Sequence, residues 1–106
     1  MSTQIAKIWL SYDIGINGDY NGLFAWLDSH HAEECGDSMA IIKEYNYTGD
    51  LESYVKQDIK ENISLEKSDR IYLICTNPVT AKFIFGGRKQ SAWTGYAVRN
   101  SNDTDV

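Results

Sequence analysis

The chain has few of the residues that stabilise small proteins through disulfides, bound metals or a restricted backbone. Among its 106 residues are two cysteines, one proline and two histidines. Two cysteines without a repeated spacing argue against a disulfide framework and against a zinc site. The longest apolar run is far too short to span a membrane, and the N-terminal Met-Ser-Thr-Gln lacks the cationic region of a secretory signal. We therefore expect a reduced, cytoplasmic protein that does not enter a membrane.

Positive charge is also scarce, because 10 Lys and Arg stand against 15 Asp and Glu, a net charge of −5. Such a chain does electrostatic work to approach a phosphate backbone, which disfavours nucleic acid as a general partner. The hydrophobic fraction of 42% is typical of a packed globular protein. We expect one domain over residues 1–99 and a mobile polar tail over residues 100–106.

The first half of the chain predicts a strand, a loop and a helix. Residues 5–12 suit a strand, and Asp19 after the glycine-containing loop suits a helix N-cap. Residues that share helical spacing follow it: Leu23, Phe24, Leu27 and His31. The helix either ends near His30, which leaves residues 32–35 for a short strand, or continues to Cys35. Intrinsic propensity favours the longer helix, because His-Ala-Glu-Glu-Cys is a poor strand.

The second half predicts strands over 38–45, 70–76 and 81–85, with a helix after Asp50. One helical stripe carries its apolar residues: Leu51, Tyr54, Val55, Ile59 and Ile63. The stretch 86–96 suits a loop or an edge hairpin. If the first helix is short, the order is β-α-β-β-α-β with an extra C-terminal strand, an α+β, ferredoxin-like sheet with both helices on one face. If it is long, the order is βαβαββ, a short and partly parallel α/β sheet.

Asp13 is the strongest candidate for a catalytic residue, because it closes the first strand where a rigid scaffold meets a loop. Together with Asp19 it forms a candidate metal site for Mg²⁺ or Mn²⁺. The alternative is structural: Asp19 caps the helix and Asp13 hydrogen-bonds its own turn, since no third acid is fixed nearby. His30 and His31 point in different directions on a helix and do not chelate one metal together. We expect His30 at the surface and His31 half-buried.

Two surfaces are candidate binding sites. The first is the sheet face that carries Trp9, Tyr72 and Ile74, opposite the face that the helices would cover. An apolar patch left open there indicates a protein partner, and a homodimer buries the same patch twice. The second is the stretch 86–96, which mixes cations with aromatic residues and suits a phosphate-bearing or stacked-base ligand. Its four candidate binding residues are Arg88, Lys89, Trp93 and Tyr96.

Three short segments carry a resemblance. Ser11-Tyr12-Asp13 and Asp69-Arg70-Ile71-Tyr72-Leu73-Ile74-Cys75 resemble the small CRISPR-associated ribonuclease-like family, and Asp19-Tyr20-Asn21-Gly22-Leu23 brings the chain nearer to the SinR-like proteins of the same fold. The resemblance covers most of the chain up to about Cys75. It implies a ferredoxin-like fold, a homodimer and, in nuclease-type members, a divalent metal bound by the carboxylate that closes the first strand. Only Asp13 matches that position, and the stretch 86–96 has no counterpart.

A second resemblance is to a shortened Toll/interleukin-receptor-like signalling domain, carried by Trp9-Leu10-Ser11-Tyr12 and by the strand from Asp69 to Ile74. The further strand–helix units of that fold are missing after Thr76. The leading hypothesis is a non-catalytic binding or regulatory module that acts as a homodimer through an open aromatic sheet face. The alternatives are a divalent-metal-dependent nuclease and the signalling domain, and a mimic of nucleic-acid charge fits the acidity alone.

Overall fold

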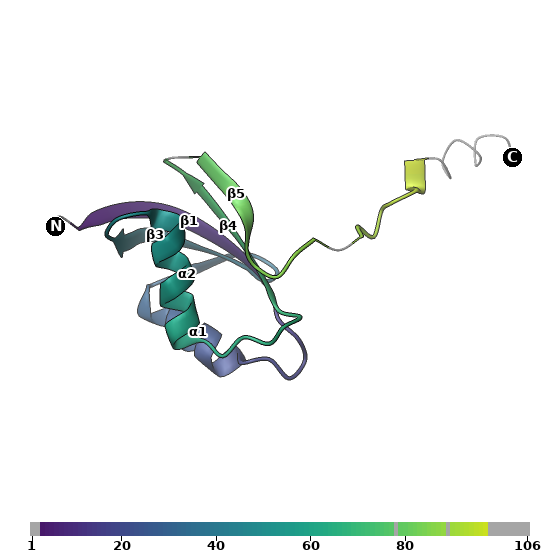
Figure 1. Ribbon diagram of the computed structural model, residues 1–106, viewed down its shortest axis with the longest axis horizontal. Helices are drawn as coiled ribbons and strands as arrows, with labels where there is room; N and C mark the ends of the chain where they lie inside the picture. Colours follow the sequence, from purple (N-terminus) through teal and green to yellow (C-terminus); the bar gives the residue numbers. More distant parts are fainter. Residues whose placement is uncertain (1–2, 78, 89, 98–106) are drawn as a thin grey trace, which may run out of the picture.

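Five antiparallel strands and two helices build two layers in the computed structural model, which describes residues 3–77, 79–88 and 90–97 (Figure 1). The elements are β1 (Gln4–Asp13), α1 (Tyr20–Ser29), β2 (Glu33–Gly36), β3 (Met39–Tyr47), α2 (Leu51–Asn62), β4 (Arg70–Thr76) and β5 (Val79–Phe85). The strands lie in the order β2-β3-β1-β4-β5.

The protein is therefore α+β, as predicted. The partly parallel alternative is wrong, because all four strand pairs in the described part of the chain are antiparallel. The predicted tail over residues 100–106 lies outside the described residues.

The first helix is the short one, and the longer helix that propensity favoured does not form. His31 adopts φ 56°, in the left-handed region, and its N–H donates to the Asp28 carbonyl at 3.0 Å. The Ala32 N–H then donates to the Leu27 carbonyl at 3.0 Å, which ends α1. Residues from Glu33 onward pair with β3 instead. A ready partner strand outweighs the poor intrinsic strand propensity of this stretch.

The buried stripe of α1 also differs from the prediction. Trp26 is 4% exposed and packs in the core with Leu23 and Leu27, whereas Phe24 is 51% exposed. His30 is half-buried and His31 is exposed, the reverse of what we expected. The reason is that α1 ends before His31, so that helical spacing does not extend to this residue.

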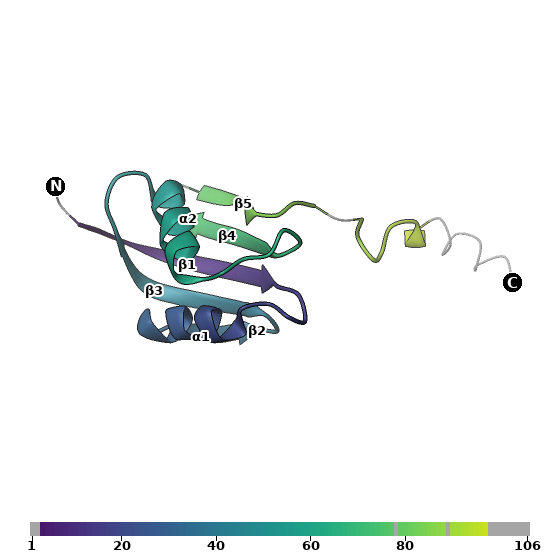
Figure 2. The ribbon, with the colours of Figure 1, turned by 60° about the horizontal axis from the view of Figure 1, so that its bottom comes forward.

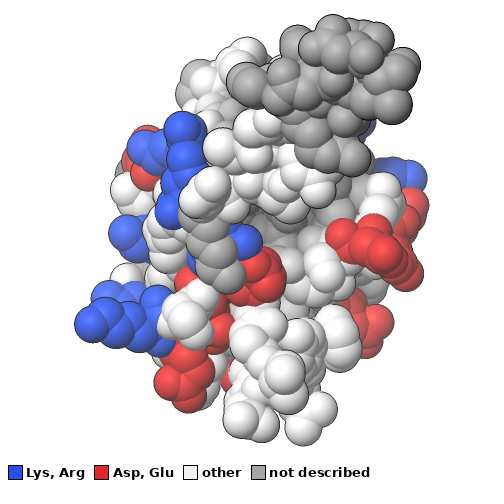
Figure 3. Space-filling model, turned by 90° about the vertical axis from the view of Figure 1, so that its right-hand side faces the viewer, with Lys and Arg blue, Asp and Glu red and all other residues white. Residues whose placement is uncertain are grey.

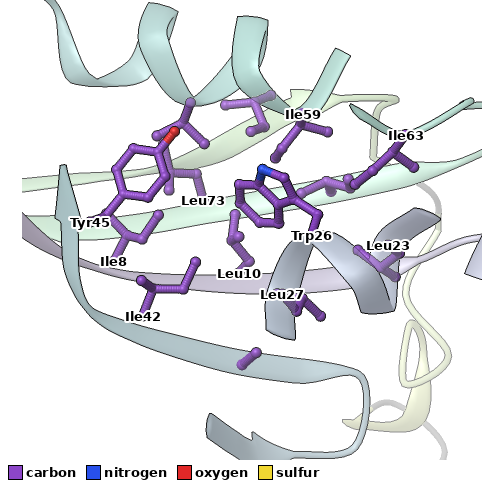
Figure 4. Packing of buried hydrophobic residues seen from close by; sticks show 14 of the residues in the cluster. Ile8, Leu10, Leu23, Trp26, Leu27, Ile42, Tyr45, Ile59, Ile63 and Leu73 are labelled. Carbon is purple, nitrogen blue, oxygen red and sulfur yellow. The ribbon is translucent and has the colours of Figure 1, made fainter. Parts of the chain in front are cut away.

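Both helices cover the same face of the sheet, as Figures 1 and 2 show. Alternate residues of the central strands point at them, so that Ile8 and Leu73 have no exposed surface. Figure 4 shows these side chains meeting α1 and α2 in one continuous core. α2 is also tied to the outer strand, because Lys82 pairs with Glu52 at 2.9 Å and Lys56 lies 5.8 Å from the Phe85 ring centroid.

Two aspartates join the loops at the end of the sheet where β1 finishes. The buried Asp69 accepts from the Gly15 N–H at 2.9 Å and from the Glu66 N–H at 2.7 Å. Asp19 caps α1 through the Gly22 N–H and also accepts from the Ser64 N–H, both at 2.9 Å. The loop before α1 is therefore held against the loop after α2 by carboxylates that receive backbone donors.

Removal of the Asp69 carboxylate should destabilise the fold. Asp69→Ala leaves two backbone N–H groups without their acceptor, which is expected to lower the free energy of unfolding by about 2–4 kcal/mol. Urea denaturation checks this, with Asp37→Ala in the exposed β2–β3 turn as control. Equal stability of the two variants would contradict the role assigned to Asp69.

The Asp19 contacts also predict an acid dependence. Hydrogen bonds from Ser64 and Gly22 lower the pKa of Asp19 from its ordinary value of 3.8. Its stabilisation is therefore complete above pH 3.8 and disappears as the pH falls through the lower, folded-state value. The difference in unfolding free energy between wild type and Asp19→Asn should shrink as the pH falls below about 4. Urea titrations at several pH values measure it, with Asp37→Asn as control, and a difference independent of pH would contradict the prediction.

Candidate functional site

The face of the sheet that the helices leave open carries a patch of large apolar side chains. Trp9 of β1 sits opposite Ile41 of β3 on one side and Ile74 of β4 on the other. Tyr72 and Phe83 are neighbours across β4 and β5, with ring centroids 4.9 Å apart in an edge-on arrangement. All six members are only half-buried, and we call them the open-face patch: Trp9, Met39, Ile41, Tyr72, Ile74 and Phe83.

An ion pair closes the patch at the end of β1. Asp13 and Arg70 are register partners, and the Nε and Nη2 atoms of Arg70 both donate to Oδ2 of Asp13, with the Nε bond at 3.2 Å. The guanidinium carbon of Arg70 also lies 5.7 Å from the Phe83 ring centroid. Gly86 fits beside Arg70 because a side chain there would approach Cγ of Arg70 to 2.6 Å, and its φ is 72°.

The two predicted metal-binding aspartates serve different contacts. Asp13 pairs with Arg70 on the open face, whereas both oxygens of Asp19 accept backbone N–H groups at the helix side. Asp19 is thus the helix cap that the structural alternative described, but Asp13 pairs with a cation from the neighbouring strand. Within the described residues no group of three or more His, Cys, Asp or Glu side chains is placed to hold a metal ion.

The open face differs from the rest of the protein in charge. Residues 3–85 carry 7 basic and 13 acidic side chains, a net charge of −6. Side chains alternate between the two faces along each strand, and a bulge sets two β3 residues opposite Lys7. The open face therefore carries equal numbers of basic and acidic side chains. These are Lys7, Lys43 and Arg70 against Asp13, Glu33 and Glu44. The excess negative charge therefore lies elsewhere.

A polar cluster that we did not predict joins the two helices to β3. Oδ2 of Asp58 accepts from the Tyr45 hydroxyl at 2.8 Å and from Nε1 of Trp26 at 3.1 Å, and Nε2 of His30 lies 3.3 Å from the same oxygen. Burial and the hydrogen bond to Asp58 raise the pKa of Tyr45 well above its ordinary value. The signal available in the sequence was the helical spacing of four residues between Trp26 in α1 and His30, which caps the end of α1. Because every contact ends on one carboxylate between two helices, the cluster holds α1 against α2.

The described residues 86–88 and 90–97 form an arm that leaves the body after β5, and no described strand pairs with the outer edge of β5 (Figure 1). Trp93 is 74% exposed and Tyr96 is 56% exposed. Two hydrogen-bonded turns shape the arm, Thr94 N–H to Ser91 and Tyr96 N–H to Trp93. The arm is therefore the loop that we considered, and not an edge hairpin.

The predicted binding residues thus fall into two groups. Trp9 and Tyr72 lie on the open face, whereas Arg88, Trp93 and Tyr96 lie on the arm. Lys89, predicted with them, lies outside the described residues.

Comparison of the chain with protein-family models, curated proteins and solved structures gave no significant match. Among the described residues, no helix has the length and apolar character needed to cross a membrane. We therefore infer function from the geometry of the two surfaces.

The cluster around Asp58 predicts a stability effect. Tyr45→Phe removes the hydroxyl that donates to Asp58 in a buried position, and we expect a loss of about 1–2 kcal/mol in the free energy of unfolding. Tyr54→Phe is the matched control, because its ring packs against Tyr45 while its hydroxyl makes none of the described hydrogen bonds. Denaturation curves of the two variants compare the effects, and a Tyr54→Phe loss as large as that of Tyr45→Phe would contradict the prediction.

Proposed function

We propose that this protein is a small binding or regulatory module that works as a homodimer joined through the open-face patch. The observation that carries the proposal is a half-exposed group of aromatic and aliphatic side chains on a sheet face that neither helix covers (Figure 2). Contiguous apolar surface of this kind normally marks a protein–protein contact. Trp, Tyr, Phe and Met are also the residues enriched at such contacts.

A second copy of the chain is the partner that the charges favour. Two bodies with a net charge of −6 repel each other, and the repulsion is smallest where positive and negative side chains balance. The open face meets this condition, and a two-fold contact would set the same neutral, apolar patch against itself. Asp13 and Arg70 would then lie at the rim, where ion pairs influence specificity more than affinity.

The arrangement of the elements supports a ferredoxin-like topology with one added strand. The chain order is β-α-β-β-α-β followed by β5, the first four strands lie in the order β2-β3-β1-β4, and both helices cover one face. The resemblance to the SinR-like and CRISPR-associated ribonuclease-like families implies the same topology and a homodimer. A cytoplasmic location remains part of this proposal, from the low cysteine content.

Arg70 separates this proposal from the nuclease alternative. A divalent cation at Asp13 would have to displace a guanidinium that donates through two nitrogen atoms to the same carboxylate oxygen. For this reason we place Asp13 and Arg70 in the rim of a contact surface and do not assign them to a metal-dependent reaction.

The dimer contact predicts the effect of a charge at the centre of the patch. Trp9→Glu should weaken self-association by about tenfold or more, because it removes a large aromatic side chain and places a charge opposite its own copy. Sedimentation equilibrium measures the dissociation constant. Phe24→Glu is the control, because Phe24 is exposed on the helix side.

Circular dichroism of each variant verifies that the fold is intact. A wild-type protein that stays monomeric at its highest soluble concentration would overturn the dimer. Equal effects of the two substitutions would show that the contact lies elsewhere.

A further inference from the structure

A groove of about 350 Å³ lies between α1 and the β2–β3 hairpin, on the helix side of the molecule. Its floor is apolar, with Leu27 and Ala40, and two aromatic side chains, Tyr12 and Phe24, line it. Phe24 is 51% exposed although it belongs to α1, so that the groove presents an aromatic surface to an incoming chain. This combination of apolar floor and aromatic wall suits a side chain of similar character.

The charged residues of the groove have one sign. Asp28, Glu33 and Glu34 line it, and no Lys or Arg is among its described lining residues. Burial, Glu34 and more weakly Asp37 raise the pKa of Tyr12, as expected where negative charge accumulates. Of the three, Glu33 already pairs with Lys43 at 3.3 Å. Figure 3, which views the molecule from the side where the arm leaves, shows most of the basic side chains in view on one side and acidic side chains on both sides.

The arm has the complementary chemistry. From residue 86 to residue 99 the sequence contains three basic residues and no acidic one. Arg88 is exposed, and Trp93 is 74% exposed. Arg88 and Trp93, exposed on a body with a net charge of −6, match the acidic, aromatic groove in both charge and polarity.

The position of the arm favours the groove of another copy. The arm starts after β5, at one edge of the sheet, and the groove lies beside β2, at the opposite edge. Four strand spacings of about 4.8 Å separate these edges, roughly 19 Å, and the groove opens on the helix side. Figure 2 shows the arm directed away from the body and not back across it. In a pair of copies, each would give one arm and receive the other.

We propose that residues 86–97 of one copy dock into the α1–β2 groove of a second copy. The groove meets the open face at the β2 edge, where Met39 and Glu33 belong to both surfaces, but the rest of the contact lies outside the open-face patch. It requires a second copy but does not depend on the contact through Trp9, and the two can therefore fail separately.

A native cysteine allows a direct test in the full-length chain. Cys35 is exposed in β2, next to Glu34 of the groove, whereas Cys75 is buried. One protein carries Ala92→Cys, an exposed arm position, together with Cys35→Ser. It is mixed with affinity-tagged wild type under mild oxidation, and mass spectrometry of peptides quantifies the disulfide between position 92 and Cys35. In this mixture that disulfide can form only between two copies.

The control protein carries Glu61→Cys together with Cys35→Ser, which places the cysteine on the exposed side of α2. We expect the cysteine at arm position 92 to react with Cys35 at least about fivefold faster than the control cysteine at position 61. A fivefold ratio corresponds to about 1 kcal/mol of docking free energy. The excess should fall when salt is raised and when Asp28→Lys and Glu34→Lys are introduced together into the tagged copy, because both changes remove the charge attraction.

Three results would overturn the proposal. The first is a rate equal to that of the control. The second is an excess that the groove substitutions leave unchanged. The third concerns a protein that carries Ala92→Cys and keeps its native Cys35. If the disulfide forms within single copies of this protein while the mixture yields none, the arm binds its own body.

The same experiment in a Trp9→Glu background separates the two proposals. An arm disulfide that persists while self-association through the patch is weakened supports docking of the arm independently of the sheet-face dimer. The groove residue Phe24 is unchanged in the Trp9→Glu background. Loss of the disulfide between position 92 and Cys35 in this background would therefore contradict the claim that the arm docks independently of the sheet-face dimer.

Discussion

The placement of both helices on one face of the sheet is the constraint on which the rest of the structure depends. Alternate residues of each strand then have different fates: Ile8 and Leu73 enter a sealed core, whereas Trp9 and Tyr72 remain half-exposed. A five-stranded sheet with cover on both sides would have no such surface. The open-face patch is therefore a direct consequence of how the two helices connect the strands, and its composition of Trp, Tyr, Phe, Met and Ile suits a second protein surface better than water.

Carboxylates fix the remaining geometry. Asp69 and Asp19 accept backbone donors across the two loops beside β1, and Asp58 gathers donors from α1 and β3. Three acids of an acidic chain are thus used as hydrogen-bond acceptors within the fold. Asp69 and Asp58 satisfy donors in partly buried positions, whereas the Ser64 donor of Asp19 is exposed. Asp13 differs, because its described partner is the guanidinium of Arg70 at the rim of the open face. Asp13 is therefore part of a surface, whereas Asp19, Asp58 and Asp69 hold the elements of the fold together.

The distribution of charge gives the molecule two distinct surfaces for contact. The open face is neutral and apolar, whereas the groove beside α1 is acidic and the arm is basic. A neutral apolar face associates mainly through burial of surface, which salt hardly weakens, but an acidic groove with a basic arm depends on attraction that salt screens. One chain can therefore combine a contact that is insensitive to salt with one that is sensitive to it.

The sequence by itself determined the positions of most strands and of the second helix, the cap at Asp19, and the sorting of Trp9 and Tyr72 onto the face opposite Leu10 and Leu73, but it left two orders of the elements open, one α+β and one α/β. These follow from local rules: strand alternation, helical spacing and capping chemistry act over a few residues. Only the tertiary structure decided that residues 33–36 form a strand, that Trp26 and His30 turn inward to Asp58, and that Asp13 meets Arg70. Each of these depends on a partner that is distant in the sequence, and local propensity contains no information about such a partner.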